Sequence, residues 1–173
     1  MGHWTLSFLG YPQVSHRNLP AKFPTRKSLA LLCYLAVEAA PVSRARLMTL
    51  LWPDSDTKRG RTALRTTLTQ LRDALSGGLN TPETFVLSEG DTLSLNPQWD
   101  VSIDTRILEA GLVAAQHYAR SGGRALEQRA ALEQAVAAYR GDFLEGFSLS
   151  DAPEFDDWAS LQRETQHRNL SRV

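Results

Sequence analysis

The sequence predicts a mainly α-helical protein with small β elements, divided into two parts near residue 100. Apolar residues recur at helical spacing in several segments, and short alternating runs lie before and after the first helical group. The pattern beyond residue 103 is entirely helical. With 173 residues, 42% of them apolar, the chain is long enough for one domain or two small ones.

The N-terminal segment has the pattern of β-strands. Trp4, Leu6 and Phe8 alternate with polar residues in "WTLSFLG", and "QVSHRNLPAKF" supplies further short pieces that Pro20 separates. We therefore expect short strands before the first helix.

Three helices are expected next, each behind a capping residue. Thr25 can cap the first, and Ser43 can cap a short second helix that "WP" at 52–53 ends. Asp54, Ser55 or Asp56 can cap the third, which is expected to end near "SGG" at 76–78. The predicted core consists of Leu29, Leu32, Leu47, Leu50, Leu64, Leu68 and Leu71.

A β-hairpin is expected after the third helix. The runs "TFVLS" and "TLSLN" are joined by "EGD", a three-residue link that contains Gly90. A short glycine-containing link between two alternating runs is typical of a hairpin.

The second part is expected to be α-helical. Helices are predicted at about 104–120 and 124–139, followed by a loop and a last helix that carries Phe155 and Trp158. Two adjacent antiparallel helices of about this length are typical of a helical-repeat unit, so we expect a tetratricopeptide-like arrangement.

Charge is balanced overall but unevenly distributed. The chain has 19 Lys and Arg and 19 Asp and Glu, yet no acid occurs between Asp56 and Asp73. That gap carries Lys58, Arg59, Arg61, Arg65 and Arg72. A one-sided segment in a neutral chain indicates an anionic partner or a solvated basic face.

Helical geometry gives this basic segment two faces. Leu64, Leu68, Leu71 and Leu75 form one narrow stripe, which is expected to face the core. Lys58, Thr62, Arg65, Thr66 and Thr69 then lie on the flank and back of the helix.

The order of strands, three helices and a hairpin is that of a winged helix-turn-helix. In that fold the third helix enters the major groove of DNA and the hairpin reaches the backbone or the adjacent minor groove. Further cations lie at the starts of the first two helices, where phosphate contacts are expected: Arg26, Lys27, Arg44 and Arg46.

The chain also resembles a known family over nearly its whole length. "FPTRKSLALLCYLA", "PVSRARLMTLLWPDSD", "RTALRTTLTQLRDAL" and "GDTLSLNP" resemble the OmpR-type winged helix of SARP-type bacterial transcriptional activators. "VSIDTRILEA", "AVAAYRGDFLEGF" and "PEFDDWASLQRE" resemble the start of the bacterial transcriptional activation domain in the same family. The resemblance implies a winged helix over residues 1–99 and part of the activation domain over 100–173. That domain is about twice as long in the family, so a truncated chain is expected.

The resemblance also implies roles for individual residues. The base-facing positions would be Thr62, Arg65, Thr66, Thr69 and Gln70, and Arg72 would contact phosphate. Ser88 to Thr92 would form the tip of the wing, and the "WPDSDTKRG" loop, with Trp52, Asp54 and Asp56, would contact RNA polymerase. The complete expected DNA-binding set is Arg26, Lys27, Arg44, Arg46, Lys58, Arg61, Thr62, Arg65, Thr66, Thr69, Gln70, Arg72, Ser88 and Thr92.

Gly60 conflicts with a continuous third helix. Glycine inside a helix costs about 1 kcal/mol relative to alanine. This leaves open a recognition helix that begins only after Gly60, with Lys58 and Arg59 in the preceding loop.

The sequence favours neither an enzyme nor a cofactor-binding protein. The four histidines have no metal-ligand spacing, the single Cys33 sits in an apolar run, and no glycine-rich nucleotide motif is present. No apolar run is long enough to cross a membrane. We expect a cytoplasmic protein without cofactor or metal.

The predicted function is sequence-specific binding of double-stranded promoter DNA and recruitment of RNA polymerase. A monomer is expected in solution, and the resemblance implies a dimer on promoter direct repeats. One alternative remains open: a helical-repeat protein-interaction module whose basic helix only covers the surface.

Overall fold

The computed structural model describes residues 3–76, 85–120 and 126–171 of the chain. These residues form two compact units that alternate along the sequence. The first unit comprises Met1–Asn18, Val101–Ser148 and Trp158–Val173, and the second comprises Leu19–Asp100 and Leu149–Asp157. The division of the chain into domains at residue 100 stays a prediction.

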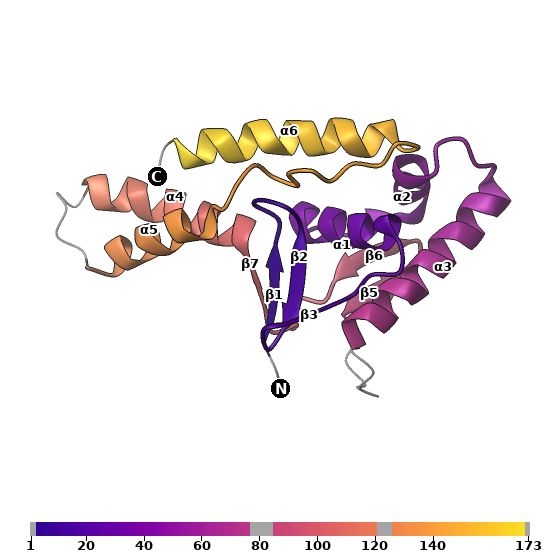
Figure 1. Cartoon of the computed structure of the whole chain (residues 1–173), viewed down its shortest axis with the longest axis horizontal. Helices are drawn as coiled ribbons and strands as arrows, with labels where there is room; N and C mark the ends of the chain where they lie inside the picture. The colour runs from indigo at the N-terminus through magenta and orange to yellow at the C-terminus, as the bar shows by residue number, and fades with distance from the viewer. Residues whose placement is uncertain (1–2, 77–84, 121–125, 172–173) are drawn as a thin grey trace. The chain divides into compact units, whose positions relative to one another are not determined.

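The second unit contains three helices and a small antiparallel sheet (Figure 1). The helices are α1 (Arg26–Glu38), α2 (Arg44–Leu51) and α3 (Thr57–Ser76). The strands β4 (Val42–Ser43), β5 (Val86–Glu89) and β6 (Thr92–Leu95) pair in the order β4-β6-β5. Helix α3 packs against both α1 and α2. We call the β5–β6 hairpin the wing.

Side-chain caps fix where these helices begin. The Thr25 hydroxyl accepts a hydrogen bond from the amide of Ser28, and the Ser43 hydroxyl accepts one from Arg46. At α3 the carboxylate of Asp56 accepts from the amide of Arg59 at 2.8 Å. Each side chain satisfies an amide that the helix itself leaves without a partner. Thr25 and Ser43 are therefore caps as predicted, and Asp56 is the cap among the three predicted candidates.

The leucines of the three helices form the core of this unit. All predicted core residues except the partly exposed Leu29 are buried, and so are Leu31, Leu35, Leu51, Leu75 and Cys33. The burial of Leu64, Leu68, Leu71 and Leu75 confirms that one narrow stripe of α3 faces inward.

The third helix is continuous through Gly60, so the alternative of a later start is wrong. Gly60 is buried, and a Cβ built on it would lie 3.3 Å from the sulfur of Met48 on α2. The absence of a side chain lets α3 approach α2 closely, which offsets the low helix propensity of glycine. Lys58 and Arg59 therefore belong to the helix.

The wing forms as expected, with a shorter turn than the sequence indicates. Glu89 pairs with Thr92, so the turn consists of Gly90 and Asp91 rather than three residues. Gly90 has a φ of +56°, a conformation that favours glycine. The amide of Arg44 donates to the carbonyl of Asp91 at 2.8 Å, which ties the turn to the start of α2.

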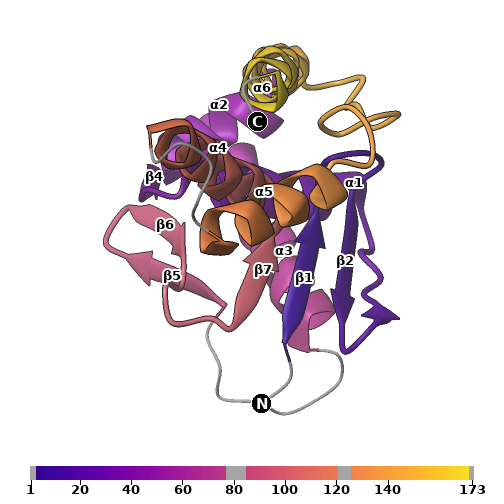
Figure 2. The same ribbon diagram turned by 90° about the vertical axis from the view of Figure 1, so that its left-hand side faces the viewer.

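The first unit contains a small sheet beside a helix pair. Strand β1 (Trp4–Ser7) pairs antiparallel with β2 (Gln13–His16) and parallel with β7 (Val101–Ile103), as Figure 2 shows. The short strand β3 (Leu19–Pro20) follows β2 along the chain. The buried carboxylate of Asp104 accepts a hydrogen bond from the amide of Leu9 at 2.8 Å.

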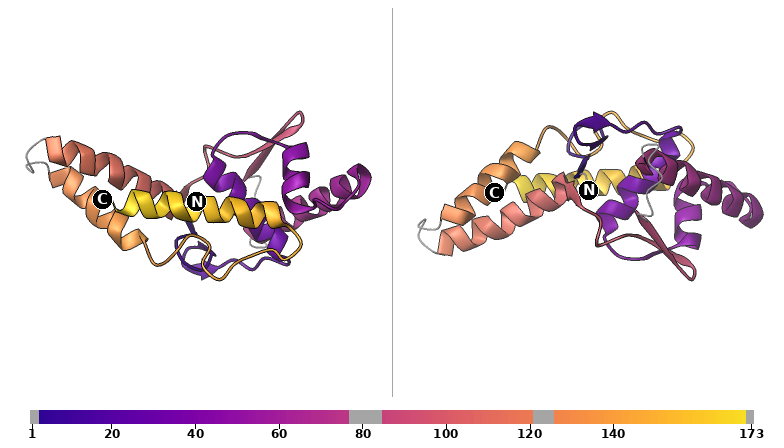
Figure 3. Two further views of the ribbon diagram at one scale, coloured as in Figure 1. Left: turned by 90° about the horizontal axis from the view of Figure 1, so that it is seen from above. Right: turned by 90° about the horizontal axis from the view of Figure 1, so that it is seen from below.

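Helices α4 (Asp104–Arg120) and α5 (Leu126–Ala138) run side by side in both views of Figure 3. They pack closely at Gly111, where an added Cβ would overlap that of Ala135. The last helix, α6, spans Pro153–Leu170. The predicted class, mainly α with small β elements in a winged helix followed by helices, is confirmed. The glycines at 77–78, where the sequence predicts the end of the third helix, lie outside the described residues.

Candidate nucleic-acid interface

The solvent-facing side of α3 carries cations and threonines and only one acid, Asp73. The exposed predicted contacts on this helix are Lys58, Arg61, Thr62, Arg65, Thr66, Thr69 and Arg72, and Arg59 is exposed as well. Gln70 is partly exposed. Because the leucine stripe is buried, these side chains make up the available surface of the helix.

The threonines and the arginines occupy different parts of this surface. At about 100° per residue, Thr62 and Thr66 lie within about 30° of the direction opposite the leucines. Arg61, Arg65 and Arg72 lie closer to one edge of the buried stripe. These three arginines therefore line one flank of α3, and hydroxyl groups occupy the centre of its exposed face.

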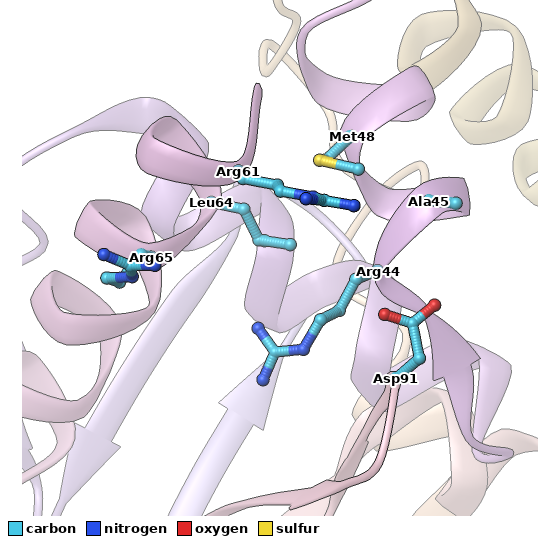
Figure 4. Close-up of a pocket in the computed structure, with 7 residues that line it drawn as sticks. All are labelled: Arg44, Ala45, Met48, Arg61, Leu64, Arg65 and Asp91. Atoms are coloured by element: carbon cyan, nitrogen blue, oxygen red, sulfur yellow. The ribbon is translucent and has the colours of Figure 1, made fainter. Parts of the chain in front are cut away.

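A pocket of about 390 Å³ lies where this flank meets α2 and the wing. Its lining residues are Arg44, Ala45, Met48, Arg61, Leu64, Arg65 and Asp91, drawn in Figure 4. Three guanidinium groups against one carboxylate give the pocket an excess of positive charge. Such an excess favours an anionic ligand.

Arg44 is held in place, whereas the other two arginines are not. Its Nη2 donates to the hydroxyl of Ser88 on the wing at 2.7 Å. Among the described residues, the side chains of Arg61 and Arg65 have no hydrogen-bond or ion-pair partner. These two guanidinium groups therefore keep all their donors for an external anion.

The wing supplies further polar groups near α3. Nη2 of Arg72 donates to the carbonyl of Val86 at 3.4 Å, and the Thr92 hydroxyl donates to the carbonyl of Glu89 at 2.9 Å. The first bond joins the wing to the C-terminal half of α3, and the second lies within the wing itself. Arg72, Ser88 and Thr92 thus lie on neighbouring elements, although each already has a protein partner.

Two of the predicted phosphate contacts are ion-paired within this unit. Nζ of Lys27 lies 2.7 Å from a carboxylate oxygen of Asp151, and Nη1 of Arg46 lies 3.0 Å from one of Glu154. Both acids belong to residues 149–157, which we call the acidic segment. Nothing in the sequence indicates these pairs, because the partners are more than 100 residues apart.

The charge states of these groups follow from their contacts. A hydrogen bond with Tyr34, supported by Glu154, raises the pKa of Arg46 above its ordinary value. Lys27 lowers the pKa of Asp151, because its ammonium group stabilises the carboxylate. The Arg46 guanidinium and the Asp151 carboxylate are therefore charged at neutral pH.

The predicted polymerase-contact loop begins at the end of α2. Trp52 is the C-cap of α2, and Nζ of Lys27 lies 5.3 Å from the centre of its ring, within the range of a cation–π contact. Asp56 caps α3, and Asp54 is exposed between them. Asp56 therefore has a structural role as the cap of α3. This role is separate from the contact with RNA polymerase that the sequence resemblance implies.

The start of α1 lies next to α3. The hydroxyl of Thr25 donates to the side-chain carbonyl of Gln70 at 3.0 Å. Arg26, the first residue of α1, is exposed. Sequence reasoning identified Thr25 only as a cap, since nothing in the sequence indicates that residues 25 and 70 meet.

No chemistry other than anion binding stands out in the described residues. They contain no group of three or more His, Cys, Asp or Glu side chains placed to hold a metal ion. Within the same ranges, no helix has both the length and the apolar character that a membrane crossing needs.

Comparison with known proteins identifies a similar fold. No protein-family model matches the chain, and no curated protein matches it. The structure of EmbR from Mycobacterium tuberculosis, solved in complex with a low-affinity phosphopeptide, is similar with a TM-score of 0.75 and 22% sequence identity. The similarity covers 98% of this chain and 44% of EmbR, so the chain spans less than half the length of that protein. The chain therefore has the fold of the part of EmbR that it matches.

Proposed function

We propose that this chain is a transcriptional regulator of the SARP type that binds double-stranded promoter DNA in a sequence-specific manner and recruits RNA polymerase. The α3 surface would lie in the major groove, with Thr62, Arg65, Thr66, Thr69 and Gln70 toward the bases. Arg44, Arg61 and Arg72 would contact phosphates, and the wing would approach the backbone.

The pocket between α2, α3 and the wing is the observation that carries this proposal. Three arginines line it, and two of them have no partner among the described residues. Such groups are expected beside a polyanion, where each neutralised phosphate releases a counterion and adds to the affinity. The fold shared with EmbR and the resemblance in sequence to SARP-type activators support the same function.

The resemblance also suggests how the protein assembles on its site. Two copies on direct repeats would meet the same face of the duplex if half-sites are spaced by about 10 to 11 base pairs. We expect a monomer in solution and a dimer on DNA, with Trp52 and Asp54 toward RNA polymerase and Asp56 mainly a helix cap. Cytoplasmic location and the absence of catalytic activity are part of the proposal.

The salt dependence of DNA binding tests this function. If about five to seven phosphates are neutralised, log K should fall with log salt at a slope of about −4 to −6. Fluorescence anisotropy with duplexes selected from a random pool, measured at several salt concentrations, gives this slope. Absence of duplex binding at low salt would reject the proposal.

A protein-interaction module remains the second candidate because of the α4–α5 pair. Val113 and Val136 on these helices are 54% and 58% exposed, and exposed apolar side chains on a helix pair can contribute to a contact with a partner protein. An interaction through such a surface would persist at high salt, whereas DNA binding would not. The same titration therefore separates the two candidates.

A further inference from the structure

Thr25 and Gln70 form a hydrogen bond that joins the start of α1 to the exposed side of α3. The Thr25 hydroxyl lies 3.0 Å from the side-chain oxygen of Gln70. The other possible acceptor for its single proton, the Ser28 hydroxyl, is farther away at 3.2 Å and already accepts from the Thr25 amide. The shorter contact favours donation to Gln70.

The capping arrangement leaves the proton of the Thr25 hydroxyl available for the hydrogen bond to Gln70. Its oxygen accepts from the amide of Ser28 at 3.2 Å, while the Ser28 hydroxyl donates to the carbonyl of Thr25 at 2.7 Å. A hydroxyl can accept and donate at the same time. Thr25 therefore caps α1 with its lone pair and orients Gln70 with its proton.

Gln70 lies on the part of α3 that is available to a ligand. At about 100° per residue, Gln70 lies about 50° from the direction opposite the leucine stripe. Thr69 lies at the same angle on the other side of that direction. It is partly exposed. Because the bond from Thr25 holds the carbonyl oxygen on the side of α1, the amide turns its NH₂ group, with two donors, toward the surroundings.

We propose that Thr25 is a positioning residue that presents Gln70 to DNA as a hydrogen-bond donor only, and that this favours guanine at one position of the site. This inference rests on the proposed function. An unrestrained glutamine pairs with adenine through both its oxygen and its nitrogen. A donor-only glutamine fits guanine better, because N7 and O6 of guanine both accept.

The test uses three variants and a duplex in which each position carries each of the four bases. Gln70→Ala identifies the position that Gln70 contacts, because the preference there should disappear. Thr25→Gly removes the hydroxyl, while glycine keeps most of the capping stability. Thr25→Ser keeps both the cap and the donor, so it is the matched control.

At the position that Gln70→Ala identifies, the wild type should bind guanine more tightly than adenine. Thr25→Gly should reduce this ratio about tenfold, because the freed amide can turn to adenine, whereas Thr25→Ser should preserve it. Urea denaturation of all variants checks that each is folded at the temperature of the binding assay.

Several outcomes would overturn the inference. Adenine preference in the wild type would mean that Gln70 offers its oxygen as well. A Gln70→Ala protein that is weaker on all duplexes alike would mean that Gln70 contacts the backbone, and an unchanged Thr25→Gly profile would remove Thr25 from the mechanism. Absence of wild-type binding to any duplex would instead reject the proposed function itself.

Discussion

Lys27 and Asp151 form an ion pair, with 2.7 Å between Nζ and a carboxylate oxygen, that joins the first turn of α1 to the acidic segment. Arg46 and Glu154 form a second pair at 3.0 Å. Residues Leu149, Ala152 and Phe155 of the same segment are buried. The acidic segment therefore belongs to the compact unit that contains α1, α2 and α3, and it neutralises two cations there.

These pairs predict different effects for two arginines of α2. Arg46→Ala should leave the salt slope of DNA binding unchanged and lower the free energy of unfolding by up to about 1 kcal/mol, since the pair is exposed. Arg44→Ala should flatten the slope by about one, because Arg44 lines the pocket. Anisotropy titrations and urea denaturation measure the two quantities. Equal flattening by both variants would mean that Arg46 leaves Glu154 to contact DNA.

Close packing of α4 on α5 predicts the effect of a single methyl group. Gly111→Ala would place its Cβ on that of Ala135, and overpacking of this kind costs about 1 to 3 kcal/mol. The second change Ala135→Gly should restore part of the loss. Thermal unfolding of the single and double variants measures it, and a Gly111→Ala protein more stable than the wild type would contradict the packing.

Burial of Asp104 predicts a pH dependence of stability. Loss of hydration raises its pKa above the ordinary 3.8, although backbone hydrogen bonds, including those from Leu9 and Thr105, oppose the shift. An acid whose pKa is raised in the folded state contributes its full stabilisation of the fold at pH values below its pKa in the unfolded chain. This contribution is lost as the pH rises through the pKa of the folded state. The stability of the wild type relative to Asp104→Asn should therefore fall from pH 3.8 upward.

Urea denaturation of both proteins between pH 4 and 7 measures this difference. The exposed Asp157→Asn serves as the control for a lost carboxylate. A stability difference between wild type and Asp104→Asn that increases with pH would contradict the assigned direction of the shift.

The position of Trp52 at the end of α2 predicts that its substitution affects transcription more than DNA binding. Trp52→Ala should lower transcription in a reconstituted assay more than it lowers duplex affinity, because Trp52 lies in the proposed polymerase-contact loop. Trp52 also contacts Lys27, so Lys27→Met, which keeps the aliphatic chain, controls for loss of that contact. If affinity and transcription fell in parallel for Trp52→Ala, the loop would have no separate role.

Much of the second unit could be predicted because its signals are local. Thr25, Ser43 and Asp56 stand directly before the helices that they cap, and the leucine spacing of α3 repeats within four residues. The wing follows from Gly90 between two alternating runs. Such patterns depend on neighbours in the sequence, which a single sequence displays.

The remaining features depend on contacts between distant residues. The pairs Lys27–Asp151 and Arg46–Glu154, and the bond between Thr25 and Gln70, join residues that lie 45 to 124 positions apart. Gly60 is similar, because its place in a helix is explained only by Met48 on another helix. The sequence alone therefore does not show which cations are ion-paired. Only the three-dimensional structure distinguishes the paired Lys27 and Arg46 from Arg61 and Arg65.

The most direct test of the account compares Arg65→Ala with Arg129→Ala on a selected operator and on a scrambled duplex. Arg65 lines the pocket, whereas Arg129 lies on α5 and pairs with Glu133 at 2.9 Å, so both variants lose one exposed arginine. Arg65→Ala should weaken operator binding by about 1 to 3 kcal/mol and reduce the preference for operator over scrambled DNA, and Arg129→Ala should match the wild type. An Arg65→Ala protein that binds the operator as the wild type does would contradict the assignment of α3 as the helix that reads DNA.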